Sequence, residues 1–215
     1  MAAKVLAASR EQAQKLIMAG RVYVDEVKVL KPAQALDEEA NLILRGDIAP
    51  FASRGAHKLE KAMNFFQADV RDLVCMDIGA ATGGFTDVLL RAGARKVYAI
   101  DVGYGQLDWK LRQDPRVAVM ERTNARTLLP EQFPDHPTLT VMDVSFISIK
   151  LVLPAAAAIM GEAGRFLTLV KPQFEAGRGQ VGKNGVVREP GPHERVLRAI
   201  RDFCPVSGWR VRGFP

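Results

Sequence analysis

The stretch Cys75-Met-Asp-Ile-Gly-Ala-Ala-Thr-Gly-Gly-Phe-Thr-Asp87 decides the fold of this 215-residue chain. Its first residues are largely apolar and predict the end of a buried strand, its glycines predict a tight turn, and Thr86 to Leu90 begin an amphipathic helix. The next predicted strand, Arg95 to Asp101, ends in a carboxylate 22 residues after Gly79. A nucleotide-binding β-α-β unit places its ribose-binding acid at this distance, so the stretch predicts a nucleoside-cofactor site.

The glycine pattern indicates which nucleoside is bound. In the pattern G-x-G-x-x-G the second glycine lets a pyrophosphate approach the backbone, and Ala81 occupies that position here. Asp77, directly before the turn, would repel a diphosphate but attract a sulfonium or an ammonium group. These two residues favour S-adenosylmethionine over NAD as the cofactor.

We expect the cofactor to contact this turn and the strand ends that follow it. The predicted contacts are Asp77, Gly79, Gly83, Gly84, Phe85, Asp101 and Asn124. A helix N-cap is an alternative role for Asn124. The turn itself could also belong to any Rossmann-like connection between a strand and a helix.

The composition is that of a folded protein with a polyanionic partner. Hydrophobic residues make up 48% of the chain and charged residues 25%, which is enough to form a proper core. The net charge is +6, and residues 162–215 hold ten basic residues against five acidic ones. This excess suggests a polyanion as partner, although a solvated basic surface would have the same composition.

Cysteine, histidine and hydropathy patterns exclude several classes of protein. The two cysteines, Cys75 and Cys204, form neither a disulfide framework nor a metal motif, which indicates the reducing cytoplasm. The three histidines show no ligand spacing, so we expect no metal site. No apolar run reaches the ~18 residues of a membrane span, and the first residues lack a signal core, so we expect no membrane segment and no export.

The N-terminal part of the chain predicts a small basic module. A capping box at Ser9 to Gln12 opens a helix that Gly20 ends, two β runs alternate about an Asp25-Glu26 turn, and a third strand covers 41–45. The stretch from Ser9 to Val24 resembles the S4-type RNA-binding module, from which it departs in lacking most of the first helix. The resemblance implies that basic side chains of this module dock on structured RNA, and the candidates are Arg10, Lys15 and Arg21. An ordinary packing unit of helix and strands is the alternative.

From Leu73 onward, predicted strands and helices alternate. The expected strands are 73–78, 95–101, 116–121, 138–143, 165–171 and 208–212, with helices at 84–92, 148–160 and 192–203 and a loop or short helix at 103–112. This alternation is typical of a parallel sheet, here of six strands, covered by helices on both faces. A doubly wound sheet binds its ligand beyond the carboxyl ends of its strands.

Two of these strand ends carry opposite charges. Asp143 closes the strand Leu-Thr-Val-Met-Asp, and Lys171 closes Phe-Leu-Thr-Leu-Val-Lys. Side chains at neighbouring strand ends meet in one cleft, where the pair could be a structural ion pair or a catalytic one. Its expected place beside a methyl donor favours catalysis.

Four motifs, in chain order, resemble those of the TlyA family. They are Ser53-Arg-Gly-Ala-His-Lys58, Asp77-Ile-Gly-Ala-Ala-Thr-Gly-Gly-Phe-Thr86, Met142-Asp-Val-Ser-Phe-Ile147 and Leu169-Val-Lys-Pro-Gln-Phe174. This family comprises bacterial proteins called hemolysins that are similar to FtsJ-type ribose 2′-O-methyltransferases. The resemblance implies a Rossmann-like α/β domain, dependent on S-adenosylmethionine, preceded by a small α+β S4-like domain. We expect the S4-like domain at 1–47, a linker at 48–54 and the methyltransferase domain at 55–215.

The resemblance also implies a Lys-Asp-Lys-Glu catalytic set, whose first three members map onto Lys58, Asp143 and Lys171. Lys171 is expected to be the base or to orient the hydroxyl group, while Asp143 holds the two lysines. A solvated surface lysine is the alternative for Lys58. The glutamate is expected on a strand beyond Pro215, so we expect the chain to end before the last strand of the domain.

The function that follows is a cytoplasmic RNA methyltransferase that modifies a ribose 2′-hydroxyl in structured ribosomal RNA, and the family implies a cytidine. Further RNA contacts are expected from Arg54 and His57, and from Arg178 and Lys183 in the glycine-rich segment 177–185, which could instead be a plain connector. A non-catalytic RNA-binding or ribosome assembly factor is an alternative, favoured if the missing glutamate is natural. A membrane-acting hemolysin is another, and the lack of an apolar span argues against it.

Overall fold

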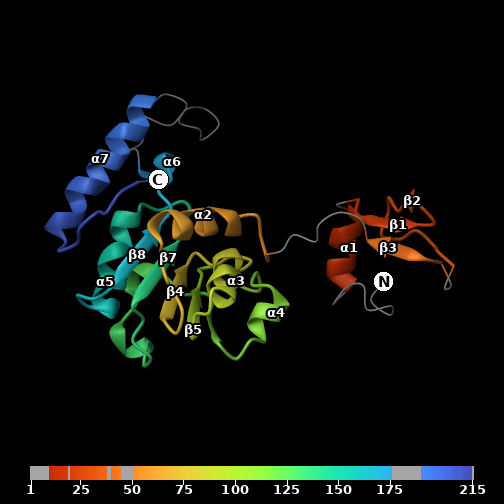
Figure 1. Ribbon diagram of the computed structural model, residues 1–215, viewed down its shortest axis with the longest axis horizontal. Helices are drawn as coiled ribbons and strands as arrows, with labels where there is room; N and C mark the ends of the chain where they lie inside the picture. Colours follow the sequence, from red (N-terminus) through yellow and green to blue (C-terminus); the bar gives the residue numbers. More distant parts are fainter. Residues whose placement is uncertain (1–9, 19, 38–39, 45–50, 176–189, 215) are drawn as a thin grey trace. The chain divides into compact units, whose positions relative to one another are not determined.

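The computed structural model describes residues 10–18, 20–37, 40–44, 51–175 and 190–214. The chain divides into two compact units, Met1–Pro50 and Phe51–Pro215 (Figure 1), which are described separately. Four sequence predictions fall outside the described residues: the incomplete first helix, the capping residue Ser9, and the RNA-binding candidates Arg178 and Lys183.

The described part of the N-terminal unit is a helix followed by a small sheet. Helix α1 (Arg10–Met18) precedes β1 (Val22–Val24), β2 (Val27–Lys28) and β3 (Leu42–Leu44), which form an antiparallel sheet in the order β2-β1-β3. Asp25 and Glu26 make the hairpin turn, with the positive φ angles, 46° and 74°, that two-residue hairpins require. The helix, the hairpin and the third strand predicted from the sequence are confirmed.

The second unit is built on a five-stranded parallel sheet in the order β6-β5-β4-β7-β8. The strands are β4 (Val74–Ile78), β5 (Lys96–Ile100), β6 (Val117–Met120), β7 (Leu139–Met142) and β8 (Arg165–Thr168). The chain builds outward from β4 through β5 to β6 and then returns to the other side of β4 with β7. The strand order therefore reverses between β4 and β7, which is where doubly wound sheets bind their ligands.

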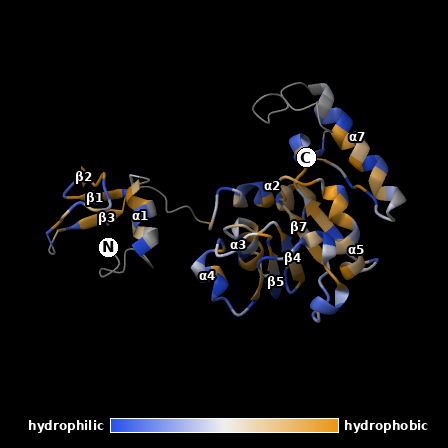
Figure 2. Ribbon diagram, turned by 180° about the vertical axis from the view of Figure 1, so that it is seen from behind, coloured by the Kyte–Doolittle hydropathy of each residue, from blue (hydrophilic) through white to orange (hydrophobic). Residues whose placement is uncertain are grey.

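Helices cover both faces of this sheet, because alternate strand residues are apolar on both sides. The helices are α2 (Ala56–Phe66), α3 (Gly84–Arg91), α4 (Trp109–Arg112), α5 (Leu153–Met160), α6 (Pro172–Glu175) and α7 (Pro190–Val206), with 3₁₀ turns at Ala125–Thr127, Pro130–Gln132 and Ile149–Leu151. One core cluster joins Cys75 and its face of the sheet to α2, α3 and α4, and the other joins Met76 and its face to α5 and α7. Figure 2 shows the apolar strands between these helices.

The structure corrects the expected number of strands. Residues 208–212 were predicted as a sixth strand, but in the described part of the chain they form none. Gly208 turns the backbone at φ +80° directly after α7, and the ring of Trp209 then packs edge-on against Phe166 of β8, 4.7 Å away. The side chain of Trp209 therefore packs against β8, while the backbone of 208–212 pairs with no strand in the described part of the chain.

Two further expected elements are shorter in the structure. The helix predicted over 148–160 is divided into the 3₁₀ turn at Ile149–Leu151 and α5, because Pro154 lacks an N–H and favours the first turn of a helix. The strand predicted over 165–171 ends at Thr168, although the N–H of Leu169 still donates to Met142. Among the described residues, no helix is both long enough and apolar enough to cross a membrane.

Candidate active site

The glycine-rich turn lies at the point where the strand order reverses. Gly79 follows β4 with φ +86°, and its N–H donates to the carbonyl of Ile100 on β5. A Cβ atom at Gly79 would lie 2.9 Å from the carbonyl oxygen of Asp143, which is closer than such atoms approach. The absence of a side chain at Gly79 therefore lets the ends of β4 and β7 touch. Gly83 and Gly84 begin helix α3 on the other side of the turn.

A buried carboxylate stands directly beneath this turn. Asp77 is fully buried, and its Oδ2 accepts a hydrogen bond of 2.7 Å from the hydroxyl of Thr86. Its Oδ1 is buried without a hydrogen-bond partner among the described residues. The pKa of Asp77 is raised to about 7, chiefly because burial disfavours the charged form; the hydrogen bond from Thr86 opposes this rise, and the nearby charges of Asp143 and Asp101 add to it. Three acids thus make the turn electronegative.

Asp101 ties the turn to the next strand. Its Oδ2 accepts a hydrogen bond from the N–H of Ala81 at 2.8 Å, and its Oδ1 accepts one from Gly103 at 2.7 Å. The predicted ribose acid therefore lies at the predicted place but also fixes the shape of the turn. Each carboxylate oxygen has a second lone pair, so a ligand hydroxyl could still donate to it.

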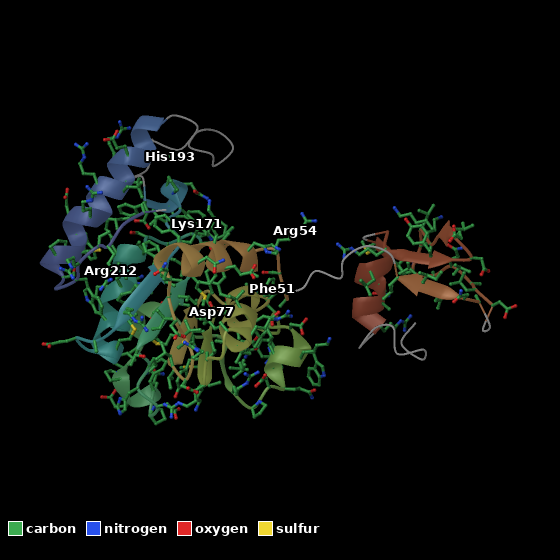
Figure 3. All side chains as sticks on the ribbon, viewed as in Figure 1. Phe51, Arg54, Asp77, Lys171, His193 and Arg212 are labelled. Atoms are coloured by element: carbon green, nitrogen blue, oxygen red, sulfur yellow. The ribbon has the colours of Figure 1, made fainter. Side chains whose placement is uncertain are left out.

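Two lysines converge on Asp143 at the carboxyl end of β7. Nζ of Lys171 lies 2.5 Å from Oδ1 of Asp143, and Nζ of Lys58 lies 3.8 Å from Oδ2. The close contact is an ion pair outside hydrogen-bond alignment, since Oδ1 has no hydrogen-bond partner in the described part of the chain. Lys171 instead donates to the hydroxyl of Ser145 at 2.7 Å. The structure thus brings together the three residues predicted to be catalytic; Figure 3 labels Lys171 and Asp77.

An aromatic pair with one exposed ring borders this cluster, and the sequence reasoning missed it. Phe146 is 92% exposed and has φ +64°, a conformation that residues with side chains rarely adopt. Its ring centroid lies 5.1 Å from that of Phe174 on α6, and Nζ of Lys171 lies 6.0 Å from the Phe174 ring. Both phenylalanines belong to motifs quoted above, so an exposed aromatic next to a charged strand end was the available signal.

The segment that carries Phe146 is anchored at its far end. Glu175 of α6 accepts a hydrogen bond from the hydroxyl of Ser148 at 2.6 Å and another from the N–H of Ile149 at 2.8 Å. These bonds hold the loop after β7 against the loop after β8. The lysine and aspartate are therefore supported by the same two loops that present the aromatic pair.

Two other predicted cofactor contacts have structural roles of their own. Asn124 caps the 3₁₀ turn at Ala125–Thr127, where its Oδ1 accepts a hydrogen bond of 3.0 Å from the N–H of Arg126. The alternative role given to Asn124 is therefore confirmed. Phe85 is buried in the core cluster on the α2 and α3 face of the sheet. Contact of either residue with a cofactor stays a prediction.

The predicted RNA-binding residues belong to both units. Arg10 and Lys15 lie on α1, and Arg21 precedes β1. In the second unit Arg54 is exposed before α2 (Figure 3). His57 is also exposed, but its Nδ1 lies 2.9 Å from a Glu60 carboxylate oxygen. Within the ranges that the structure describes, no group of three His, Cys, Asp or Glu side chains could hold a metal ion.

The fold and the site define the class of protein. It is an α/β domain that has a glycine-rich turn and a lysine–aspartate cluster at the point where the strand order reverses. The family described as FtsJ-like methyltransferase matches residues 51–213, and the S4 domain family matches residues 1–42. The "16S/23S rRNA (cytidine-2'-O)-methyltransferase TlyA" of Mycobacterium tuberculosis is 48% identical over 97% of this chain and 78% of its own length.

Two further relatives carry the other name of the family. "Hemolysin A" of Brachyspira hyodysenteriae is 45% identical over 88% of this chain and 79% of its own length. A solved structure of a hemolysin-named protein from Streptococcus thermophilus is 48% identical, covers 95% of this chain and 75% of that one, and superposes with a TM-score of 0.77. The chain therefore belongs to the FtsJ-like methyltransferases, within the TlyA family, and carries an S4 domain. The resemblance predicted from the four motifs is confirmed.

Proposed function

We propose that this protein transfers a methyl group from S-adenosylmethionine to the 2′-hydroxyl of a cytidine in ribosomal RNA. The observation that carries the proposal is the convergence of Lys58 and Lys171 on Asp143 beside the glycine turn. The name of the M. tuberculosis relative supports the substrate and the position of the methyl group. A ribosomal substrate would place the protein in the cytoplasm.

The residues at the turn fit a cationic nucleoside. Asp77 offers a buried oxygen without a partner, and Asp143 and Asp101 add negative charge that a sulfonium or an ammonium group would compensate. Asp77 would hold the amino group of the cofactor, while Asp101 would accept hydrogen bonds from its ribose. When bound, the cofactor supplies a methyl group on a sulfonium centre, ready for in-line displacement.

The lysines would activate and hold the ribose hydroxyl. The ion pair with Asp143 and the hydrogen bond to Ser145 fix Lys171, so its Nζ is in place to orient the hydroxyl oxygen. To act as the base, Lys171 would first release a proton to solvent and then receive the proton of the hydroxyl group. Lys58 would add a second positive charge against the alkoxide that develops. Asp143 keeps both nitrogens on one side of the reacting oxygen, which is the positioning that a displacement reaction requires.

The aromatic pair would hold the base of the target nucleotide. A ribose inside a helix is poorly accessible, and single-stranded or extruded bases are held by stacking on aromatic side chains. Phe146 exposes its ring beside Phe174 and three residues after Asp143. The S4 domain, through Arg10, Lys15 and Arg21, would capture the surrounding RNA, and Arg54 would extend that contact.

The test is transfer of labelled methyl groups from S-adenosylmethionine to ribosomal subunits that lack the modification, followed by digestion to nucleosides. We expect 2′-O-methylcytidine from the unchanged chain and a loss of about 1,000-fold with Lys171→Ala, since general acid–base groups contribute roughly 10²–10⁴-fold. Lys96→Ala is the matched control, because Lys96 also lies 2.5 Å from an aspartate oxygen, that of Asp135, yet stands at the start of β5. We expect less than about twofold change there.

Four results would contradict the proposal. A methyl group on a base would refute the ribose reaction, and unchanged transfer by Lys171→Ala would remove the proposed role of Lys171. Saturable cofactor binding without transfer to either ribosomal subunit would favour the RNA-binding factor. Lysis of liposomes by the purified chain, again without methyl transfer, would favour the hemolysin.

A further inference from the structure

The side chain of Lys58 is held less firmly than that of Lys171. Lys58 is 53% exposed and lies 3.8 Å from Asp143, whereas Lys171 is 18% exposed and contacts both Asp143 and Ser145 at 2.7 Å or less. A lysine stem has many rotamers, so contacts of this length fix it poorly. The position of Lys58 in the cluster must therefore be set mainly by the backbone that carries it.

Lys58 lies in the first turn of α2, which continues directly from a tight hook formed by residues 51–57. The carbonyl of Ser53 accepts the N–H of Ala56 at 3.3 Å, and the carbonyl of Gly55 accepts the N–H of Lys58 at 2.9 Å. Ser53 of the hook packs directly against Gly84, because a Cβ atom at Gly84 would lie only 2.1 Å from Oγ of Ser53. The hook is thus packed onto the first turn of α3, the helix that leaves the glycine-rich turn.

A single carboxylate fastens the start of the hook to the same helix. Oδ2 of Asp87 accepts a hydrogen bond from the N–H of Ala52 at 3.0 Å, in a partly buried position. Arg91 donates to both oxygens of Asp87, at 2.7 and 3.2 Å, and its guanidinium lies 4.7 Å from the ring centre of Phe51. The ring of Phe51 in turn meets His57 edge-on at 5.5 Å. The start of the hook is therefore tied to Asp87 and Arg91, and its end is joined to the start by the contact between His57 and Phe51.

We propose that Asp87 is a positioning residue for Lys58, a role that rests on the proposed methyl transfer. Helix α3 starts at the glycine-rich turn, and Asp87 joins the hook to that helix. Asp87 therefore sets where Lys58 stands relative to the turn and to Asp143. Displacing a catalytic group by about 1 Å can cost on the order of 100-fold in rate, so a lost anchor would act through Lys58.

Asp87 also has the features of an ordinary helix-stabilising residue. It lies in the first turn of α3 and pairs with Arg91 four residues later, an arrangement that stabilises helices by a few tenths of a kcal/mol. If Asp87 only stabilised the helix, the loss of activity caused by changing Asp87 would not depend on the presence of Lys58. The two roles are separated by asking whether the effect of changing Asp87 disappears when Lys58 is already absent.

The experiment is a double-mutant cycle on the full chain, with ribosomal subunits as substrate. We expect Asp87→Ala to lower kcat about tenfold, while the Kd for S-adenosylmethionine changes less than about twofold. Asp87→Asn retains an oxygen that can accept the Ala52 N–H and should recover most of the rate. In the Lys58→Ala background, Asp87→Ala should cost less than about twofold.

Asp114→Ala is the matched control for this cycle. Asp114 accepts the backbone N–H of Arg116 at 2.9 Å and pairs with its guanidinium, as Asp87 does with Ala52 and Arg91, but it lies between α4 and β6. We expect kcat within about twofold of the unchanged chain. Amide hydrogen exchange over residues 52–58 should quicken in Asp87→Ala and stay unchanged in Asp114→Ala.

Several outcomes would overturn the role of Asp87. Equal losses from Asp87→Ala with and without Lys58, an Asp87→Asn variant as slow as Asp87→Ala, or unchanged exchange in the hook would each do so. If Asp87→Ala does not fold, Ala52→Pro removes the donated N–H, leaves α3 intact, and takes its place in the cycle. Absence of methyl transfer by the unchanged chain would instead refute the proposed function, and the exchange measurement would still report on the anchor.

Discussion

Two lysine–aspartate pairs stand at opposite ends of the parallel sheet, and both have a nitrogen–oxygen distance of 2.5 Å. At the amino end, Oδ2 of Asp135 accepts hydrogen bonds from Lys96 and from the hydroxyl of Tyr98. At the carboxyl end, Asp143 is shared by Lys171 and Lys58, and its Oδ1 has no hydrogen-bond partner among the residues that the structure describes. The same pair of residue types thus has different partners: the carboxylate at the amino end serves one lysine and a tyrosine, and the carboxylate at the carboxyl end is shared by two lysines.

The surroundings of the two pairs also differ, being well packed at the amino end and strained at the carboxyl end. At the amino end, hydrogen bonds from Lys96 and Tyr98 lower the pKa of Asp135, and the Tyr98 ring packs on buried Phe133. At the carboxyl end, Asp77 is a buried acid with a raised pKa, and Phe146 is exposed with a positive φ. Unsatisfied groups and strained backbone persist where function uses them. The comparison therefore predicts that the pair at the amino end serves stability and the pair at the carboxyl end serves chemistry.

The sharpest way to break this comparison is to remove the charge from each aspartate in turn. We expect Asp143→Asn to reduce methyl transfer about 1,000-fold, or ~4 kcal/mol in activation free energy, because the two lysines lose the anion that holds them together. Asp135→Asn should lower the midpoint of thermal unfolding and leave transfer by the folded protein within about twofold. Methyl transfer and thermal unfolding, measured on both variants, provide the check.

The reverse pattern would refute the assignment of the two ends. If Asp135→Asn loses activity while folded, or if Asp143→Asn keeps it, then the surroundings of the pairs do not separate structure from chemistry.

The second prediction concerns the buried acid of the carboxyl end. Asp77 ionises near its ordinary pKa of 3.8 when unfolded but only near pH 7 when folded, chiefly because burial disfavours the charge. Between these values the folded chain binds more protons than the unfolded chain, so this residue lowers stability as the pH rises from about 4 to about 7. Asp77→Asn cannot ionise and should remove that decline.

The measurement is urea unfolding of the unchanged chain and of Asp77→Asn from pH 4.5 to 7.5. A shift of about three pH units at ~1.4 kcal/mol each sets a ceiling near 4 kcal/mol, and we expect the variant to gain ~2–3 kcal/mol relative to the unchanged chain over this range. Comparing the two chains cancels the titration of all other acids. Parallel pH profiles would show that Asp77 is ionised throughout.

The smallest expected effect belongs to the aromatic pair. Phe146→Ala should lower kcat/KM for ribosomal subunits about tenfold, at the lower end of the ~1–3 kcal/mol that stacking a base on an aromatic ring contributes. Phe65→Ala is the matched control, since Phe65 is also exposed and its ring lies 5.0 Å from a second phenylalanine, Phe66 on α2. Equal losses from the two variants would show that Phe146 has no special contact with RNA.

Much of the fold could be predicted because its elements depend on local pattern. The strands from β4 to β8 are short apolar runs, and parallel pairing brings their carboxyl ends to one edge whatever the details of packing. The meeting of Asp143 and Lys171 follows from that rule alone. Lys58 could be assigned to the same cluster only by resemblance, because its place depends on the packing of the hook on Gly84.

What could not be predicted depends on how side chains share their partners. The run after Gly208 has the apolar residues of a strand, and nothing local shows that Trp209 packs on Phe166 instead of joining the sheet. Likewise, the carboxylate of Asp101 was expected to face a ligand, and only the structure shows it bound to the N–H groups of Ala81 and Gly103. The contacts of Trp209 with Phe166 and of Asp101 with Ala81 join segments that are distant in sequence, so no local pattern predicts them.

Gly79 brings the glycine-rich turn after β4 into direct contact with the backbone of Asp143 at the end of β7. Because a Cβ atom there would collide with the backbone of Asp143, any replacement would push the acid away from the turn. The turn proposed to bind the methyl donor and the residue that contacts both lysines are therefore in direct contact. We therefore expect substitutions in the glycine-rich turn to occur in evolution only together with substitutions around Asp143.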